Sequence, residues 1–116
     1  MLLNEALSAC FVAQKDGRFL YQIPADFPAF EGHFPGNPLL PAVCQMGLCA
    51  DAFSRQSGKK QEISGVSRAK FMRPILPNCR VNLEFIPRPD GQYLAELTDE
   101  TGKKFSQLIC SFKEVL

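Results

Sequence analysis

The pattern of apolar and polar positions predicts two blocks of β-structure with one helix between them. Apolar and aromatic residues fill 8–14 and 18–23, and the turn sequence Lys15-Asp16-Gly17 separates them, so we expect a β-hairpin there. Nearer the C-terminus, four apolar or alternating stretches are separated by short segments that contain Pro, Gly or Asp. We expect antiparallel strands over 62–73, 80–87, 92–98 and 104–113.

Between the two blocks, residues 42–56 favour a helix because they are rich in Ala, Met, Leu and Cys and contain no proline. Pro41 is tolerated at a first turn, and Gly58 supplies a stop signal. Before its last turn, the only polar side chains of this helix are Gln45 and Asp51, so we expect the helix to be buried on most sides. One long apolar helix against an antiparallel sheet predicts an α+β fold in which the sheet wraps around the helix.

Length and charge narrow the class of protein. The 116 residues are enough for one domain, which we expect to span residues 1–116. The chain has 13 Lys and Arg against 12 Asp and Glu, and this balance argues against a general nucleic-acid-binding protein. No apolar run approaches the roughly 18 residues of a membrane span, and the N-terminus lacks the pattern of a signal peptide. We therefore expect a cytoplasmic protein that does not associate with membranes.

The cysteines predict buried thiols rather than a disulfide framework or a metal site. The chain has five cysteines, an odd number without a CxxC pair, and only one histidine. Cys44 and Cys49 have no activating partner nearby in the sequence, so we interpret them as small apolar core residues rather than nucleophiles. We expect no metal and no other cofactor.

A proline-rich loop carries the only histidine. Residues 24–41 contain five prolines, which fix φ and remove backbone donors, so we expect an ordered, non-helical loop. His33 lies in this loop, shortly before the apolar helix. A lone histidine is usually structural. However, the first amides of a helix have no partner within the helix, and an imidazole beside them can act as a general base while they polarise a carbonyl.

Two segments resemble a known enzyme family. The run GHFPGNPLLPAV at 32–43, followed by an apolar helix, resembles the active-site segment of the 3-hydroxyacyl-[acyl carrier protein] dehydratases. The run VSRAKFMRPILP at 66–77 is similar to the strand and turn that follow the helix in that family. The resemblance spans roughly residues 27–86. It implies the hot-dog fold and a role in the biosynthesis of fatty acids or related acyl chains such as polyketides and polyenes.

The resemblance also assigns roles to individual residues. It implies that His33 removes the α-proton of a thioester substrate and that the backbone amide of Ala42 holds the thioester carbonyl, although the family usually has glycine at that position. Gly36 keeps the family's glycine and allows a tight turn. Gln45 could hydrogen-bond the substrate, or it could be a buried amide whose hydrogen bonds are satisfied within the protein.

The chain departs from the family at the second catalytic residue. The family has Glu or Asp fourteen residues after the histidine, and this chain has Gly47 there. A glycine inside a helix either permits close packing or leaves space for a ligand. Asp51 follows one turn later on the same helix face, and we predict that it replaces the missing acid. The alternative is that Asp51 caps a loop or pairs with an arginine near the helix end.

Three functions follow from these residues. The first is a dehydratase-like enzyme acting on a 3-hydroxyacyl thioester, with His33 as the base and with Asp51 or water in place of the usual acid. The second is a hot-dog acyl thioesterase. The third is a non-catalytic acyl-binding protein or the inactive half of a heterodimer, in which Gly47 marks the loss of chemistry.

The resemblance implies partners as well. The substrate would be a thioester of acyl carrier protein or of coenzyme A. Arg68, Lys70 and Arg73 could form a patch for an acidic carrier protein, although a solvated basic face is the ordinary interpretation of such a set. We expect a homodimer whose two sheets join edge to edge, with His33 of one chain facing the helix of the other. The sequence does not decide whether such dimers assemble further.

Overall fold

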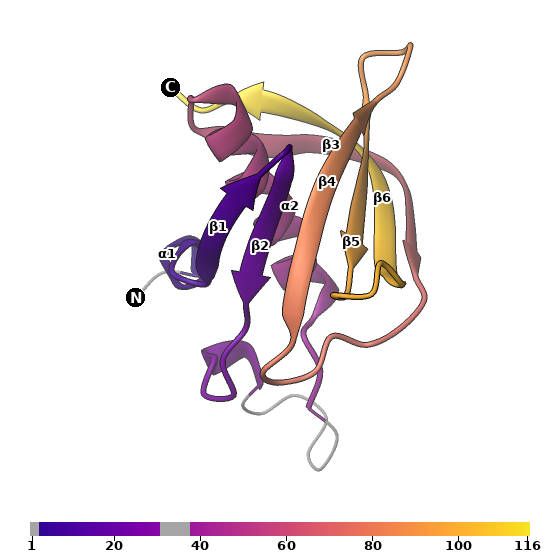
Figure 1. Ribbon diagram of the computed structural model, residues 1–116. Helices are drawn as coiled ribbons and strands as arrows, with labels where there is room; N and C mark the ends of the chain where they lie inside the picture. Colours follow the sequence, from indigo (N-terminus) through magenta and orange to yellow (C-terminus); the bar gives the residue numbers. More distant parts are fainter. Residues whose placement is uncertain (1–2, 31–37) are drawn as a thin grey trace.

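An antiparallel sheet of six strands curves around one long helix in the computed structural model, which describes residues 3–30 and 38–116 (Figure 1). The elements are, in chain order, α1 (Leu3–Ser8), β1 (Phe11–Lys15), β2 (Arg18–Gln22), a 3-10 turn (Pro28–Phe30), α2 (Ala42–Ser57), β3 (Gln61–Phe71), β4 (Arg80–Pro87), β5 (Tyr93–Thr98) and β6 (Lys104–Glu114). This arrangement confirms the predicted α+β architecture.

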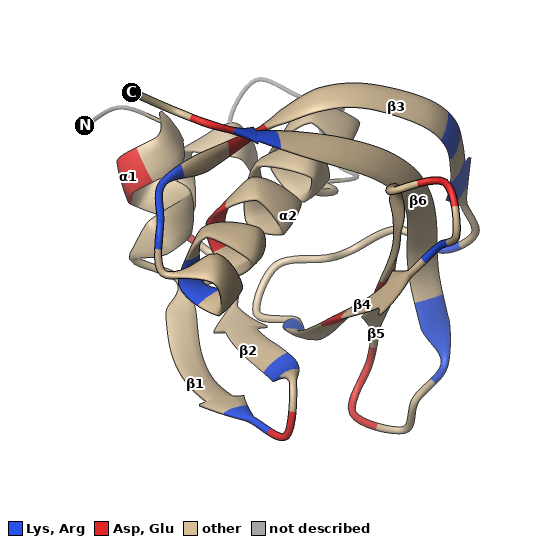
Figure 2. Cartoon of the chain, turned by 90° about the horizontal axis from the view of Figure 1, so that it is seen from above, with Lys and Arg blue, Asp and Glu red and all other residues tan. Residues whose placement is uncertain are grey.

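The strands lie in the order β1-β2-β4-β5-β6-β3, and every neighbouring pair is antiparallel. The predicted hairpin is confirmed, because Asp16 and Gly17 both adopt the positive φ that a tight two-residue turn requires. In β3, Ser64 and Ser67 lack a partner in the β6 register, which makes two β-bulges. Bulges bend a strand and increase its twist, and β3 accordingly arches over α2 (Figure 2).

Helix α2 begins and ends close to the predicted positions. Pro41 precedes its first turn and supplies no side-chain cap. Gly58 ends the helix with a left-handed φ of 74°, and its N–H donates to the Ser54 carbonyl. The face of α2 toward the sheet buries Cys44, Gln45, Leu48, Cys49, Ala52 and Phe53.

The N-terminal segment differs from the prediction. The strand expected over 8–14 starts only at Phe11, and helix α1 precedes it. The reason is the spacing of Leu3, Ala6 and Leu7, which places three apolar side chains on one helix face. Ala6 and Leu7 are buried, and α1 packs on α2 at the open side of the curved sheet (Figure 2). Two elements therefore cover α2: the sheet on one face, and α1 on part of the other.

Within the described residues, no helix combines the length and the apolar character needed to cross a membrane.

Candidate active site

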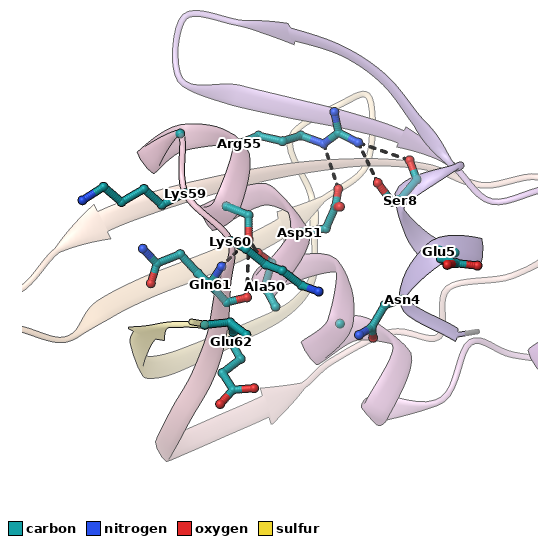
Figure 3. Close-up of a pocket in the computed structure, with 14 residues that line it drawn as sticks. Asn4, Glu5, Ser8, Ala50, Asp51, Arg55, Lys59, Lys60, Gln61 and Glu62 are labelled. Carbon is teal, nitrogen blue, oxygen red and sulfur yellow. Dashed lines mark hydrogen bonds and ion pairs between the residues drawn. The ribbon is translucent and has the colours of Figure 1, made fainter. Parts of the chain in front are cut away.

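The outer face of α2 forms the floor of an open groove of about 850 Å³ (Figure 3). Gly47 and Asp51, the two helix positions singled out in the sequence, both lie in it. Helix α1 forms one wall, and the start of β3 with the residues before it forms the other. The lining residues are Asn4, Glu5, Ser8, Gly47, Ala50, Asp51, Ser54, Arg55, Gly58, Lys59, Lys60, Gln61, Glu62 and Val115.

The place above Gly47 is filled by a side chain from α1. A Cβ atom added to Gly47 would collide with the Cδ1 atom of Leu7, and the Leu7 side chain is only 1% exposed. Close packing, one of the two explanations that the sequence left open for this glycine, is present in the structure, and Gly47 also lines the groove. The position at which the resemblance places an acid is thus a helix–helix contact in this chain.

Asp51 is held by two hydrogen-bond donors. The Tyr21 hydroxyl donates to Asp51 Oδ2 over 2.6 Å, and Arg55 Nε donates to the same oxygen over 2.9 Å. Arg55 also donates to the carbonyl and hydroxyl oxygens of Ser8 at the end of α1, and its guanidinium lies 3.7 Å from the centre of the Phe11 ring. Asp51 therefore belongs to a network that joins α2 to β2 and to α1.

Asp51 is the acceptor in this network. The side chain of Asp51 is 17% exposed and forms an ion pair with Arg55 over 2.9 Å. Burial, and then the hydrogen bond to Asp51, raise the pKa of Tyr21 above its ordinary value, so the hydroxyl keeps its proton and remains a donor. A carboxylate in this position accepts hydrogen bonds. The arginine pairing that the sequence gave as an alternative is present in the structure, and Tyr21 is a partner that sequence reasoning did not find.

At the other end of α2, Ala42 is exposed in the first turn. Among the residues that the structure describes, no acceptor contacts the Ala42 amide, and Pro41 offers no cap. Gln45, in contrast, is buried, and both ends of its amide are hydrogen-bonded inside the protein, to Ser106 and Leu40. His33 and Gly36 lie outside the described residues.

The three basic residues assigned to a carrier-protein patch have different surroundings. Arg68 and Lys70 are exposed on the C-terminal half of β3. Arg73 instead pairs with Asp99 over 2.9 Å and donates to the backbone carbonyls of Lys103 and Lys104. The hydroxyl of Thr101 lowers the pKa of Asp99 to about 2, so this ion pair persists at neutral pH. Arg73 thus fastens the end of β3 to the β5–β6 turn.

The thiols show no sign of activation. Burial raises the pKa values of Cys44, Cys49 and Cys110, that of Cys110 to about 11. A thiol with a raised pKa is protonated at neutral pH and is a poor nucleophile. In the part of the chain that the structure describes, no three His, Cys, Asp or Glu side chains are grouped so that they could hold a metal ion.

The chain is similar to dehydratases over most of its length. A family model named ApeI-like, described as ApeI dehydratase, matches residues 11–109. The 3-hydroxyacyl-[acyl-carrier-protein] dehydratase FabZ of Symbiobacterium thermophilum is 36% identical over 64 residues, which cover 49% of this chain and 45% of that protein. The FabZ of Haemophilus influenzae is 34% identical over 80 residues, which cover 60% and 54%. The chain spans about half the length of the curated relatives it matches.

Solved structures share the fold. The dehydratase heterocomplex ApeI:P from Xenorhabdus doucetiae superposes with a TM-score of 0.67 at 19% identity, over 88% of this chain and 92% of that one. The PaaI protein from E. coli gives 0.60 at 14% identity, over 97% and 89%. These likenesses, together with the six-stranded sheet around α2, confirm the predicted hot-dog fold. Because the family model covers residues 11–109 of 116, the chain belongs to the ApeI-like dehydratase family.

Proposed function

We propose that this protein dehydrates a 3-hydroxyacyl thioester in the biosynthesis of fatty acids or related acyl chains, with His33 as the general base. The observation that carries the proposal is the open first turn of α2, in which the Ala42 amide has no acceptor among the described residues, shortly after the segment that contains His33. Membership of a dehydratase family supports the same reaction. Formation of an enoyl thioester from a 3-hydroxyacyl thioester tests it.

The chemistry needs a base and a donor to the carbonyl. The His33 imidazole takes a proton from the carbon next to the thioester carbonyl, and the electron pair left behind forms the new double bond as the hydroxyl takes a proton from solvent and departs as water. The Ala42 N–H hydrogen-bonds the carbonyl oxygen, where negative charge develops. A glycine is not required for this role, because the donor belongs to the main chain and the φ of Ala42 is not positive.

The acyl group is carried as a thioester of acyl carrier protein or coenzyme A. The curated relatives are named for acyl-carrier-protein substrates, and the exposed side chains of Arg68 and Lys70 on β3 suit an acidic carrier. Arg73 contributes less to such a surface, because its guanidinium already pairs with Asp99 and donates to two backbone carbonyls.

We assign Asp51 an anchoring role in preference to the acid role, because its Oδ2 accepts from both the Tyr21 hydroxyl and Arg55 Nε and so joins α2 to its neighbours. The Asp51→Asn variant should lose about 1–3 kcal/mol of stability, since it removes the charge from two hydrogen bonds, while dehydration stays within a few-fold of the wild-type rate. Urea unfolding and steady-state kinetics measure the two effects.

The matched control for this variant is Glu84→Gln, which also neutralises a carboxylate paired with an arginine, Arg18, but at an exposed site. It should change stability by less than about 1 kcal/mol. If Asp51→Asn instead abolished dehydration without lowering stability, Asp51 would be the acid.

We also propose a homodimer joined through β3. This strand lies at an edge of the sheet, and residues 66–72 are exposed on both faces of the strand. Phe71 is 47% exposed, and Val43, Met72 and Leu76 are further exposed apolar residues. A second copy that pairs with β3 would satisfy its free backbone groups and cover apolar surface. The protein should sediment at twice its 12.9 kDa chain mass, and a strictly monomeric species at micromolar concentration would contradict this assembly.

A second candidate function is a non-catalytic subunit that acts with another chain. The packing of Leu7 against Gly47 favours it, because an acidic residue at that position would have to displace the Leu7 side chain. One structural neighbour is a dehydratase heterocomplex. In this case the isolated protein would form no enoyl product, and activity would appear only after a catalytic partner was added.

A further inference from the structure

Two polar side chains are buried in the otherwise apolar core of the described residues, and they are partners of each other. Ser106 on β6 is 0% exposed and Gln45 on α2 is 4% exposed. The Ser106 hydroxyl donates to Gln45 Oε1 over 2.7 Å. A buried polar group is costly unless it is hydrogen-bonded, so each residue of this pair depends on the other.

The pair is connected to the backbone that leads into α2. Gln45 Nε2 donates to the carbonyl of Leu40 over 3.4 Å, and the Leu40 N–H donates to the carbonyl of Ile75 over 2.8 Å. Both backbone groups of Leu40 are therefore held, one by the helix and one by the segment between β3 and β4. The next residue, Pro41, has its φ fixed by its ring.

This chain of contacts ends one peptide unit before the amide of Ala42. The Ala42 N–H shares its peptide unit with the Pro41 carbonyl, which accepts from the backbone N–H groups of Cys44 and Gln45. The direction of the Ala42 N–H therefore depends on the position of Gln45 in the first turn and on how Leu40 is held. A donor stabilises developing charge best when it is already oriented before the reaction begins.

We propose that Ser106 and Gln45 are positioning residues that orient the first-turn amide of α2 toward the substrate carbonyl. The inference rests on the proposed function, in which the Ala42 amide binds a thioester carbonyl. Neither side chain touches the substrate. Ser106 acts on Gln45, and Gln45 acts on the backbone of Leu40.

The test starts with Ser106→Ala, measured in two ways. Steady-state kinetics on a 3-hydroxyacyl thioester should show kcat lowered by about tenfold or more with KM changed by less than about twofold, because the loss concerns the transition state. In ¹⁵N–¹H NMR spectra, the amides of Ala42 and Val43 should shift and exchange with solvent faster than in the wild type.

Two further variants separate positioning from stability. The double variant Ser106→Ala/Gln45→Met replaces both polar partners with apolar groups, which should restore much of the thermal stability without restoring kcat. Cys110→Ala is the matched control, since it also removes one heavy atom from a buried β6 side chain but leaves Gln45 intact. It should lower the Tm and leave both kcat and the Ala42 amide unchanged.

Unchanged kcat and unchanged Ala42 signals in Ser106→Ala would overturn the proposal, and so would recovery of kcat in the double variant. If the wild-type protein forms no enoyl product, the proposed function fails, and the amide signals of Ala42 and Val43 still decide whether Ser106 and Gln45 orient the helix start.

Discussion

The His33→Ala variant is expected to lose dehydration activity by about 10²- to 10⁴-fold, the range typical for removal of a general base. The variant should keep the fold, so that the loss concerns activity alone. Activity of the wild-type protein should also fall toward acid pH, because only a neutral imidazole can accept the proton.

The measurement is the initial rate of enoyl thioester formation by the two proteins, each checked for the same circular dichroism spectrum and Tm. Wild-type turnover in His33→Ala would remove every catalytic role that we assign to the loop before α2.

The second large effect is expected from Gly47→Glu, which places the family's residue at its usual position. The new Cβ atom collides with Leu7, whose side chain is buried between α1 and α2. Overpacking of this kind costs about 1–3 kcal/mol. The added carboxylate must also move out of the buried contact between α1 and α2. We expect α1 to detach from α2 and the urea midpoint to fall.

Leu7→Ala should relieve the collision. Alone, it removes a buried leucine and should cost about 2–5 kcal/mol. Combined with Gly47→Glu, it should cost less than the sum of the two single changes, because each makes room for the other. Ala50→Glu is the control, since it puts the same charge at another position of α2 that lines the groove. Strict additivity in the double variant would contradict the packing described for Gly47.

The same double variant also carries information about function. In Leu7→Ala/Gly47→Glu a carboxylate has space where the family keeps its acid. If enoyl product forms only in that variant, the natural chain is the non-catalytic subunit given as the second candidate.

Local signals explain which parts of the fold the sequence predicts. The Asp16-Gly17 turn and the Gly58 stop are set by the conformations that these residues adopt, so the hairpin and the end of α2 follow from the sequence alone. Helix α1 does not follow, because six residues form a stable helix only through tertiary packing, and its packing site is Gly47, forty positions beyond Leu7.

In the candidate site too, contacts between residues close in sequence can be predicted, and contacts between distant residues cannot. Arg55 lies one turn from Asp51, so their ion pair is within reach of a sequence argument. Tyr21 donates to Asp51 from a strand thirty residues away, and periodicity does not predict that contact. The sequence gives a weaker indication of the role of Ser106. This polar residue lies on the same face of β6 as Leu108 and Cys110, and that face turns toward α2.

The most direct test of the central claim is product analysis after the wild-type protein is incubated with a 3-hydroxyacyl thioester, in parallel with a saturated acyl thioester. Dehydration predicts an enoyl thioester from the first substrate, an intact second substrate, and no release of free thiol from either. Release of free thiol from both substrates without enoyl product would identify a thioesterase and contradict the proposed dehydration.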